Sequence, residues 1–73
     1  MLTPREIEMV ERIRDGKTNK VIGMELNITE TTVKNRLTRV FQELRASDRA
    51  QAVVEAIRQG YITIDGTKPV WYW

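Results

Sequence analysis

An apolar stripe in mid-chain places the tightest limit on the fold. Five apolar residues recur there at three- and four-residue spacing: Val33, Leu37, Val40, Phe41 and Leu44. This spacing puts side chains on one face of an α-helix. Four polar residues fall on the opposite face: Thr31, Lys34, Asn35 and Thr38. The pattern predicts a helix over about residues 30–45, capped by Thr29, with one buried face and one short, polar, basic face.

Start and stop signals predict a first and a last helix around this one. The run Thr3-Pro4-Arg5-Glu6 combines a capping residue, a proline suited to the first helical position and a glutamate three residues after the cap. Asp15-Gly16 ends that first helix, because glycine readily takes the left-handed conformation. Asp48 caps the last helix, and Gly60 stops it.

A short helix is predicted between the first helix and the mid-chain helix. Thr18 caps it, and it runs to about Leu26, with Val21, Ile22 and Leu26 as its apolar positions. Gly23 interrupts it at a cost of about 1 kcal/mol of helix propensity relative to alanine. A glycine there indicates that a neighbouring helix approaches closely. This short helix and the mid-chain helix together look like a helix-turn-helix, whose second helix enters the DNA major groove.

The residue types that are missing exclude most catalytic chemistry. The 73 residues include no cysteine and no histidine, so the sequence offers no thiolate or imidazole as nucleophile, base or metal ligand. We therefore expect no enzyme activity, no cofactor and no metal site. No apolar run approaches the ~20 residues that span a bilayer, and no signal-peptide pattern is present. These features favour a cytoplasmic protein without a membrane partner.

The net charge of +2 is unevenly distributed along the chain. Residues 16–49 carry seven basic and four acidic side chains, whereas residues 1–15 carry three basic and four acidic ones, and residues 50–73 carry two of each. The positive excess coincides with the predicted helix-turn-helix and is a modest footprint for a polyanionic partner. The alternative is that these charges only solvate the surface.

An ordered set of short motifs resembles a known family. The set comprises, in order, Leu2-Thr3-Pro4-Arg5-Glu6, Gly16-Lys17-Thr18-Asn19-Lys20, Ile22 and Leu26, Ile28-Thr29-Glu30 with Thr32-Val33-Lys34, Phe41 and Leu44, and Arg49 with Gln51-Ala52-Val53. Over about residues 2–60 it resembles the LuxR/GerE-type helix-turn-helix domain of bacterial transcription regulators. The resemblance implies an all-α, four-helix domain over residues 1–60 that dimerises through its fourth helix. It also implies a nucleoid-associated bacterial protein that binds two-fold-related sites on double-stranded DNA. Four residues depart from the family pattern: Arg36 where histidine is frequent, Val21 where glutamate is frequent, Gly23 where alanine is usual and Glu43 where a basic residue is usual.

Ten residues are predicted to contact DNA. Three on the polar face of the mid-chain helix have the chemistry to read base edges: Lys34, Asn35 and Thr38. Seven are predicted to contact the DNA backbone: Thr18, Asn19, Lys20, Thr31, Thr32, Arg36 and Arg39. The alternatives are an ordinary solvated helix face and, for Thr32, a purely local bond to the backbone. Arg49 is expected to be structural and to join the third and fourth helices through carbonyls or Asp48.

The last helix is apolar over an arc of about 200°, wider than a single core contact uses. Ala52, Val53 and Ala56 match the core pattern of the family. The residues left over are predicted to form a homodimer interface: Ala50, Val54, Ile57 and Arg58. The alternative is that the alanines are simply good helix formers. A second function also stays open, in which the helix-turn-helix binds another regulator or RNA polymerase instead of DNA.

The C-terminal tail, residues 61–73, differs in character from the helices. β-branched and aromatic residues flank Asp65-Gly66, which is a hairpin signal, and Pro69 limits any strand to a sheet edge. We expect a small hairpin or an extended tail laid on the helices. Three aromatic residues are expected to cover exposed core, with a wider dimer interface or a partner protein as alternatives: Trp71, Tyr72 and Trp73.

Overall fold

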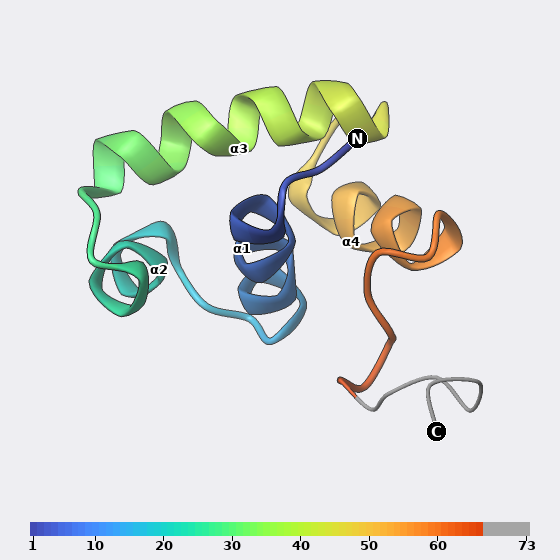
Figure 1. Cartoon of the computed structure of the whole chain (residues 1–73), viewed down its shortest axis with the longest axis horizontal. Coiled ribbons are helices and arrows are strands. Elements are labelled where there is room, and N and C mark those ends of the chain that lie inside the picture. Colours follow the sequence, from blue (N-terminus) through green and yellow to red (C-terminus); the bar gives the residue numbers. More distant parts are fainter. Residues whose placement is uncertain (67–73) are drawn as a thin grey trace.

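The chain folds into four helices, with α1 in the middle of the assembly. The computed structural model describes residues 1–66, which form α1 (Pro4–Arg14), α2 (Asn19–Leu26), α3 (Glu30–Leu44) and α4 (Arg49–Arg58), with no strand among them. α3 is the longest helix and runs along one side of the molecule, while α2, α1 and α4 follow one another beneath it (Figure 1). The predicted all-α, four-helix fold is confirmed.

Side-chain caps start the helices where the sequence predicts them. The hydroxyl of Thr3 accepts a hydrogen bond from the amide of Glu6, whose carboxylate accepts one from the amide of Thr3 at 2.9 Å, so the capping box is complete. The other three starts are also capped: Thr18, Thr29 and Asp48 each accept from an amide three residues on. These caps satisfy amides that would otherwise lack a partner at each helix start.

The helix ends follow two different patterns. Gly16 and Gly60, after α1 and α4, have φ angles of 82° and 86°, as the stop signals predict. α2 and α3 instead end on left-handed residues without glycine, Asn27 at φ 60° and Arg45 at φ 58°. Asparagine tolerates this conformation better than arginine does. α3 therefore stops at Leu44, just short of its predicted end.

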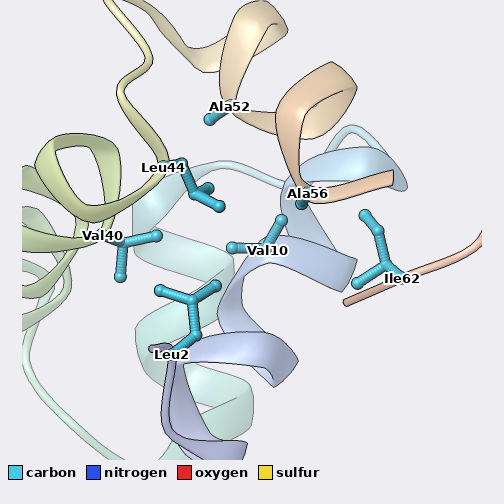
Figure 2. Close-up of a cluster of buried hydrophobic side chains, with 7 residues drawn as sticks. All are labelled: Leu2, Val10, Val40, Leu44, Ala52, Ala56 and Ile62. Atoms are coloured by element: carbon cyan, nitrogen blue, oxygen red, sulfur yellow. The ribbon is translucent and has the colours of Figure 1, made fainter. Parts of the chain in front are cut away.

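The apolar side chains form two clusters that meet at α1 and α3. The first joins α1, α3 and α4 and is drawn in Figure 2: Leu2, Val10, Val40, Leu44, Ala52, Ala56 and Ile62. The second joins α1, α2 and α3: Met9, Ile13, Ile22, Leu26, Val33 and Leu37. Phe41 and Val53 pack against both clusters. The apolar stripe of α3 is thus held along its length, which fixes the direction of its opposite face.

The turn between α2 and α3 is tight at Gly23. A Cβ at this position would lie 2.7 Å from the carbonyl oxygen of Ile28, whose amide donates to the Gly23 carbonyl at 2.9 Å. The predicted close approach is confirmed, and the neighbour is the backbone of the turn that leads into α3. Of the three apolar positions of α2, Ile22 and Leu26 are buried, whereas Val21 is 37% exposed. α2 buries only the narrow strip of Ile22, Gly23 and Leu26, and Val21 lies beside that strip.

The segment after α4 packs back on the helices. Ile62 is 7% exposed and lies beside Ala56 in the first cluster (Figure 2). The amide of Leu2 donates to the hydroxyl of Tyr61 at 3.2 Å, and Arg14 donates to the carbonyl of Thr63 at 3.0 Å. Packing therefore continues beyond residue 60, the predicted domain boundary. The second half of the predicted hairpin lies outside the described residues, as do Trp71, Tyr72 and Trp73.

Candidate nucleic-acid interface

The polar face of α3 is open to solvent. Four predicted contact residues are exposed along it: Thr31, Lys34, Asn35 and Thr38. The opposite face is buried through the stripe from Val33 to Leu44, so the two faces predicted from the sequence are confirmed. Sequence reasoning missed Gln42, which is also exposed and lies one helical turn beyond Thr38. The same helical periodicity that singled out Thr38 could have identified it.

Two of the base-reading candidates share a cleft with a backbone-contact candidate on α2. The cleft has a volume of about 140 Å³ and is lined by Asn19, Lys34, Leu37, Thr38, Phe41 and Arg49. A second cleft, of about 430 Å³, is lined by Ile13, Gly16, Lys17, Thr18, Asn19, Glu30 and Arg49. Asn19 and Arg49 line both clefts. The start of α2 and one edge of the reading face therefore lie together on one side of the molecule.

Several threonine hydroxyls on this side are engaged within the chain. Thr38 donates to the carbonyl of Lys34 at 3.1 Å. The hydroxyls of Thr29 and Thr32 are 2.8 Å apart, so Thr32 takes part in the cap of α3. Thr18 accepts from the amide of Val21 at 3.2 Å. The Thr32 hydroxyl is thus engaged locally, but with the Thr29 side chain and not with the backbone as considered, and the phosphate contacts predicted for these threonines stay predictions.

Three of the four cations predicted to contact DNA have no acidic partner among the described residues, and Arg39 is the exception. Within residues 1–66, no carboxylate pairs with Lys20, Lys34 or Arg36, although ion pairs tie down Arg5, Arg12, Arg14, Lys17, Arg39 and Arg58. Lys17 and Arg12 share Glu25, at 2.5 and 2.9 Å. The hydrogen bond from Lys17, followed by that from Arg12, holds the pKa of Glu25 below its ordinary value of 4.5. Lys17 is therefore neutralised locally, whereas Lys20 is not.

Arg39 has a structural partner that the sequence did not indicate. Its Nη1 lies 3.0 Å from Oε2 of Glu6, and that glutamate side chain is 2% exposed, whereas the Arg39 side chain is 53% exposed. Glu6 thus serves both the capping box of α1 and an ion pair to α3. The predicted phosphate contact of Arg39 stays a prediction, but the residue also holds α3 against α1.

Arg49 is structural, but its partner is not the one predicted. Its Nη2 donates to Oδ1 of Asn19, which connects the start of α4 to the start of α2. The expected partners were carbonyls between the third and fourth helices, or Asp48. Asp48 is instead used as the cap of α4, where it accepts from the amide of Gln51 at 2.8 Å. The side chain of Arg49 is long enough to pass this cap and reach α2.

Comparison with known proteins identifies the family. Residues 1–56 match the family model described as bacterial regulatory proteins of the luxR family. This match covers well over half of the 73 residues. The chain belongs to the luxR family. The members are DNA-binding transcription regulators and not enzymes, and the resemblance inferred from the motifs is confirmed.

Relatives within the luxR family differ greatly in length. The chain is 42% identical over 64 residues to the spore germination protein GerE of Bacillus subtilis, covering 88% of this chain and 86% of that protein. It is 53% identical over 57 residues to the transcriptional regulatory protein LiaR of B. subtilis, covering 78% of this chain and 27% of LiaR. It is 42% identical over 64 residues to the transcriptional regulatory protein DegU of Brevibacillus brevis, covering 88% and 27%. The chain thus spans about a quarter of DegU and LiaR and most of GerE.

The dimer face predicted by analogy with the luxR family is partly open. Ala50, Val54 and Arg58 are exposed, with Val54 at 51%, whereas Ile57 is half-buried and packs against the first core cluster. Arg58 forms an ion pair with Glu55 at 3.4 Å. Ala50, Val54 and Ile57 recur at helical spacing and form one row. The exposed apolar part of this row is therefore centred on Val54, while Ile57 lies partly in the core and partly at the surface.

Metal-binding groups and membrane-spanning helices are both absent from the described residues. Residues 1–66 hold no group of three or more acidic, histidine or cysteine side chains that could bind a metal ion. None of α1 to α4 is long and apolar enough to cross a membrane.

Proposed function

We propose that this domain binds double-stranded DNA with sequence preference, with α3 in the major groove and the start of α2 against the backbone. The observation that carries this proposal is the absence of acidic partners, among the described residues, for Lys20, Lys34 and Arg36. Unpaired surface cations can release DNA counterions, which supplies affinity without sequence dependence. Cations already paired, such as Lys17, would first have to leave their carboxylate.

Three residues on α3 are proposed to read bases. Lys34 can donate to O6 and N7 of guanine, and Asn35 can pair with adenine through its amide. Thr38 uses its hydroxyl hydrogen on the carbonyl of Lys34, which leaves its methyl group for contact with a thymine methyl. The proposed backbone contacts are Thr18, Asn19, Lys20, Thr31, Thr32, Arg36 and Arg39. They position the helix and carry no sequence information directly.

The domain is proposed to act as a homodimer that regulates transcription at the bacterial nucleoid, in the cytoplasm. The exposed apolar row on α4 supports this, since Val54 lies in it with half of its surface in water. A two-fold dimer places two copies of α3 on half-sites about one or more DNA turns apart. Val54→Lys should shift the sedimentation coefficient towards that of a monomer, whereas Gln51→Lys, outside the row on the same helix, should not. Equal behaviour of both variants would contradict the assignment of this face.

A selection experiment tests the DNA-binding proposal. Bound sequences are selected from a random duplex pool, and affinities for the selected duplex are measured at several salt concentrations. Lys34→Ala and Asn35→Ala should each cost about 1–3 kcal/mol and relax the preference at one base position. Lys20→Ala should weaken all sequences alike and reduce the salt slope by about 0.9, while Lys17→Ala leaves the slope nearly unchanged. Unchanged affinity in both α3 variants would refute the base-reading assignment.

Charge reversal separates DNA binding from the alternative of docking on another regulator or RNA polymerase. Lys20→Glu and Arg36→Glu should abolish a DNA complex, because they place carboxylates beside phosphates. The same changes can spare a protein complex. Arg39 is unsuitable for this test, because a glutamate there would face the buried carboxylate of Glu6 and unfold the domain for reasons unrelated to DNA.

A further inference from the structure

The start of α2 is held by an arginine from another helix. Nη2 of Arg49 donates to Oδ1 of Asn19, thirty residues earlier in the chain. Nη1 of the same guanidinium is buried and has no hydrogen-bond partner in the part of the chain that is described. The two residues line both clefts beside the reading face. Arg49 and Asn19 therefore lie together at the start of α2, beside the predicted phosphate contacts.

The hydrogen bond fixes which way the Asn19 amide faces. A guanidinium has only donors, so the carbonyl oxygen of the amide has to point at Arg49. The NH2 group, which is a donor on the other branch of the amide, then turns away from Arg49. Phosphate oxygens accept hydrogen bonds and do not donate them at neutral pH. A free amide can turn either edge outwards, whereas this one presents the edge that a phosphate can use.

We infer that Arg49 is a positioning residue for phosphate binding, acting through Asn19. This inference rests on the proposed DNA-binding function. Arg49 orients the amide so that its Nδ2 donors join the backbone amides of the first turn of α2, where an anion is favoured by the helix dipole. The adjacent Lys20, which has no carboxylate partner within residues 1–66, supplies the charge.

Because α2 is short, the hydrogen bond from Arg49 has an effect on the position of its first turn. Eight residues form a helix that is marginal by itself. Its far end is also tied down, because Arg5 of α1 donates to the carbonyl of Leu26. The hydroxyl of Thr18 is used as the cap. Thr18 accepts in this cap and keeps its hydroxyl hydrogen as a donor, and the NH2 group of Asn19 is the second neutral donor at this end.

A double-mutant cycle on DNA binding tests the inference. The probe is a fluorescein-labelled pool of random-sequence 24-base-pair duplexes, titrated with the full chain at several salt concentrations and followed by anisotropy. Arg49→Met and Asn19→Ala should each weaken binding about tenfold, and the double variant should bind no more weakly than Asn19→Ala alone. The salt slope should stay unchanged in Arg49→Met, because a neutral amide donor releases no counterion. Arg45→Met, which removes an exposed arginine at the end of α3, controls for net charge.

Three results would overturn the inference. One is equal loss from Arg49→Met in the wild-type and Asn19→Ala backgrounds. Another is a fall of about 0.9 in the salt slope, which would mean that Arg49 itself neutralises a phosphate. The third is unchanged affinity of a folded Arg49→Met variant, with folding checked by circular dichroism at the titration temperature. If the wild type shows no salt-dependent binding to this pool, the proposed function has failed and not only the role of Arg49.

A measurement on the unaltered protein covers the case in which Arg49→Met does not fold. In the 1H–15N spectrum, the side-chain NH2 signals of Asn19 should shift when the duplex pool is added. The side-chain NH2 signals of Gln51, which lies on α4 with its Oε1 bonded to Ser47, should not. Unshifted Asn19 signals in a saturated complex would contradict the inference.

Discussion

Replacing Arg39 with alanine should destabilise the domain although half of the Arg39 side chain is in water. The Glu6 carboxylate is almost completely buried and lies 3.0 Å from the Arg39 guanidinium. Its other oxygen accepts from the amide of Thr3 at 2.9 Å. Without Arg39, a buried carboxylate would keep this amide as a partner but lose its counter-charge. Removal of one partner from a buried pair is costly because the remaining charge stays desolvated.

The expected cost follows from the environment of the pair. Two unit charges about 4 Å apart attract by about 4 kcal/mol at an effective dielectric constant near 20, and by about 1 kcal/mol in bulk water. Because Arg39 is half exposed and Glu6 is buried, we expect a value between these limits, about 2–3 kcal/mol. Domains are stable by about 0.05–0.15 kcal/mol per residue, so this loss is a large part of the total. Glu6→Gln should cost less, since Arg39 can be hydrated and the Gln oxygen can still accept from Thr3.

Urea denaturation of five proteins tests this reasoning. The wild type, Arg39→Ala, Glu6→Gln and the double variant form a cycle, and Arg36→Ala is the matched control on the same helix, without an acidic partner. Arg36→Ala should change the unfolding free energy by less than about 0.5 kcal/mol. In the Glu6→Gln background, Arg39→Ala should cost under about 1 kcal/mol. A loss in Arg39→Ala no larger than in Arg36→Ala, or a cycle without coupling, would refute the argument.

Three further predictions concern other contacts. Gly23→Ala should lower the unfolding free energy by about 1 kcal/mol in urea titrations. The new Cβ would lie 2.7 Å from the Ile28 carbonyl oxygen, and the cost of displacing this carbonyl outweighs the gain of about 1 kcal/mol in helix propensity. A variant more stable than the wild type would contradict this. Glu25→Gln should be less stable than the wild type above pH 4.5, and this difference in stability should vanish as the pH falls through the lowered pKa of Glu25, because the unfolded state takes up its proton at a higher pH than the folded state does. A difference that persists in acid would contradict the ion-pair origin. Ile62→Ala should cost about 2–3 kcal/mol because Ile62 belongs to the first core cluster, and a calorimetric Tm equal to that of the wild type would show that the segment after α4 is not part of the core.

The helices could be predicted because the signals for them are local. A cap and an apolar stripe each lie within a few residues of the structure that they specify, as at Thr29 and along α3. The exposure of Val21 could not be inferred from its apolar side chain, because a helix of eight residues can bury a strip narrower than its apolar content. Ile62 escaped prediction because a single buried residue in an irregular segment has no periodicity. Its burial depends on where α1 and α4 leave space (Figure 2).

The exposed face of α3 in the candidate site could be predicted from the sequence, but the contacts that hold the surrounding helices in place could not. Exposure of Lys34 and Asn35 follows from burial of Val33 and Leu37 on the same helix. The bond from Arg49 to Asn19 joins residues thirty positions apart. An arginine in a basic segment looks the same in sequence whether it faces solvent, a phosphate or a buried side chain. Only the packing of α2 against α3 and of α3 against α4 decides which.

The contacts of Arg39 and Arg49 within the chain affect how a loss of DNA binding should be interpreted. Arg39 holds the reading helix to Glu6 on one side, and Arg49 holds the start of α2 through Asn19 on the other. Both arginines are basic residues next to the proposed DNA surface, so alanine substitution of either would reduce DNA binding and resemble the loss of a phosphate contact. The dependence of DNA affinity on salt concentration separates a lost phosphate contact from a displaced helix. Loss of a phosphate contact lowers the slope of this dependence, whereas displacement of a helix that keeps its other cations does not. An arginine on this surface is therefore a DNA contact only if its removal changes the slope at constant folded fraction.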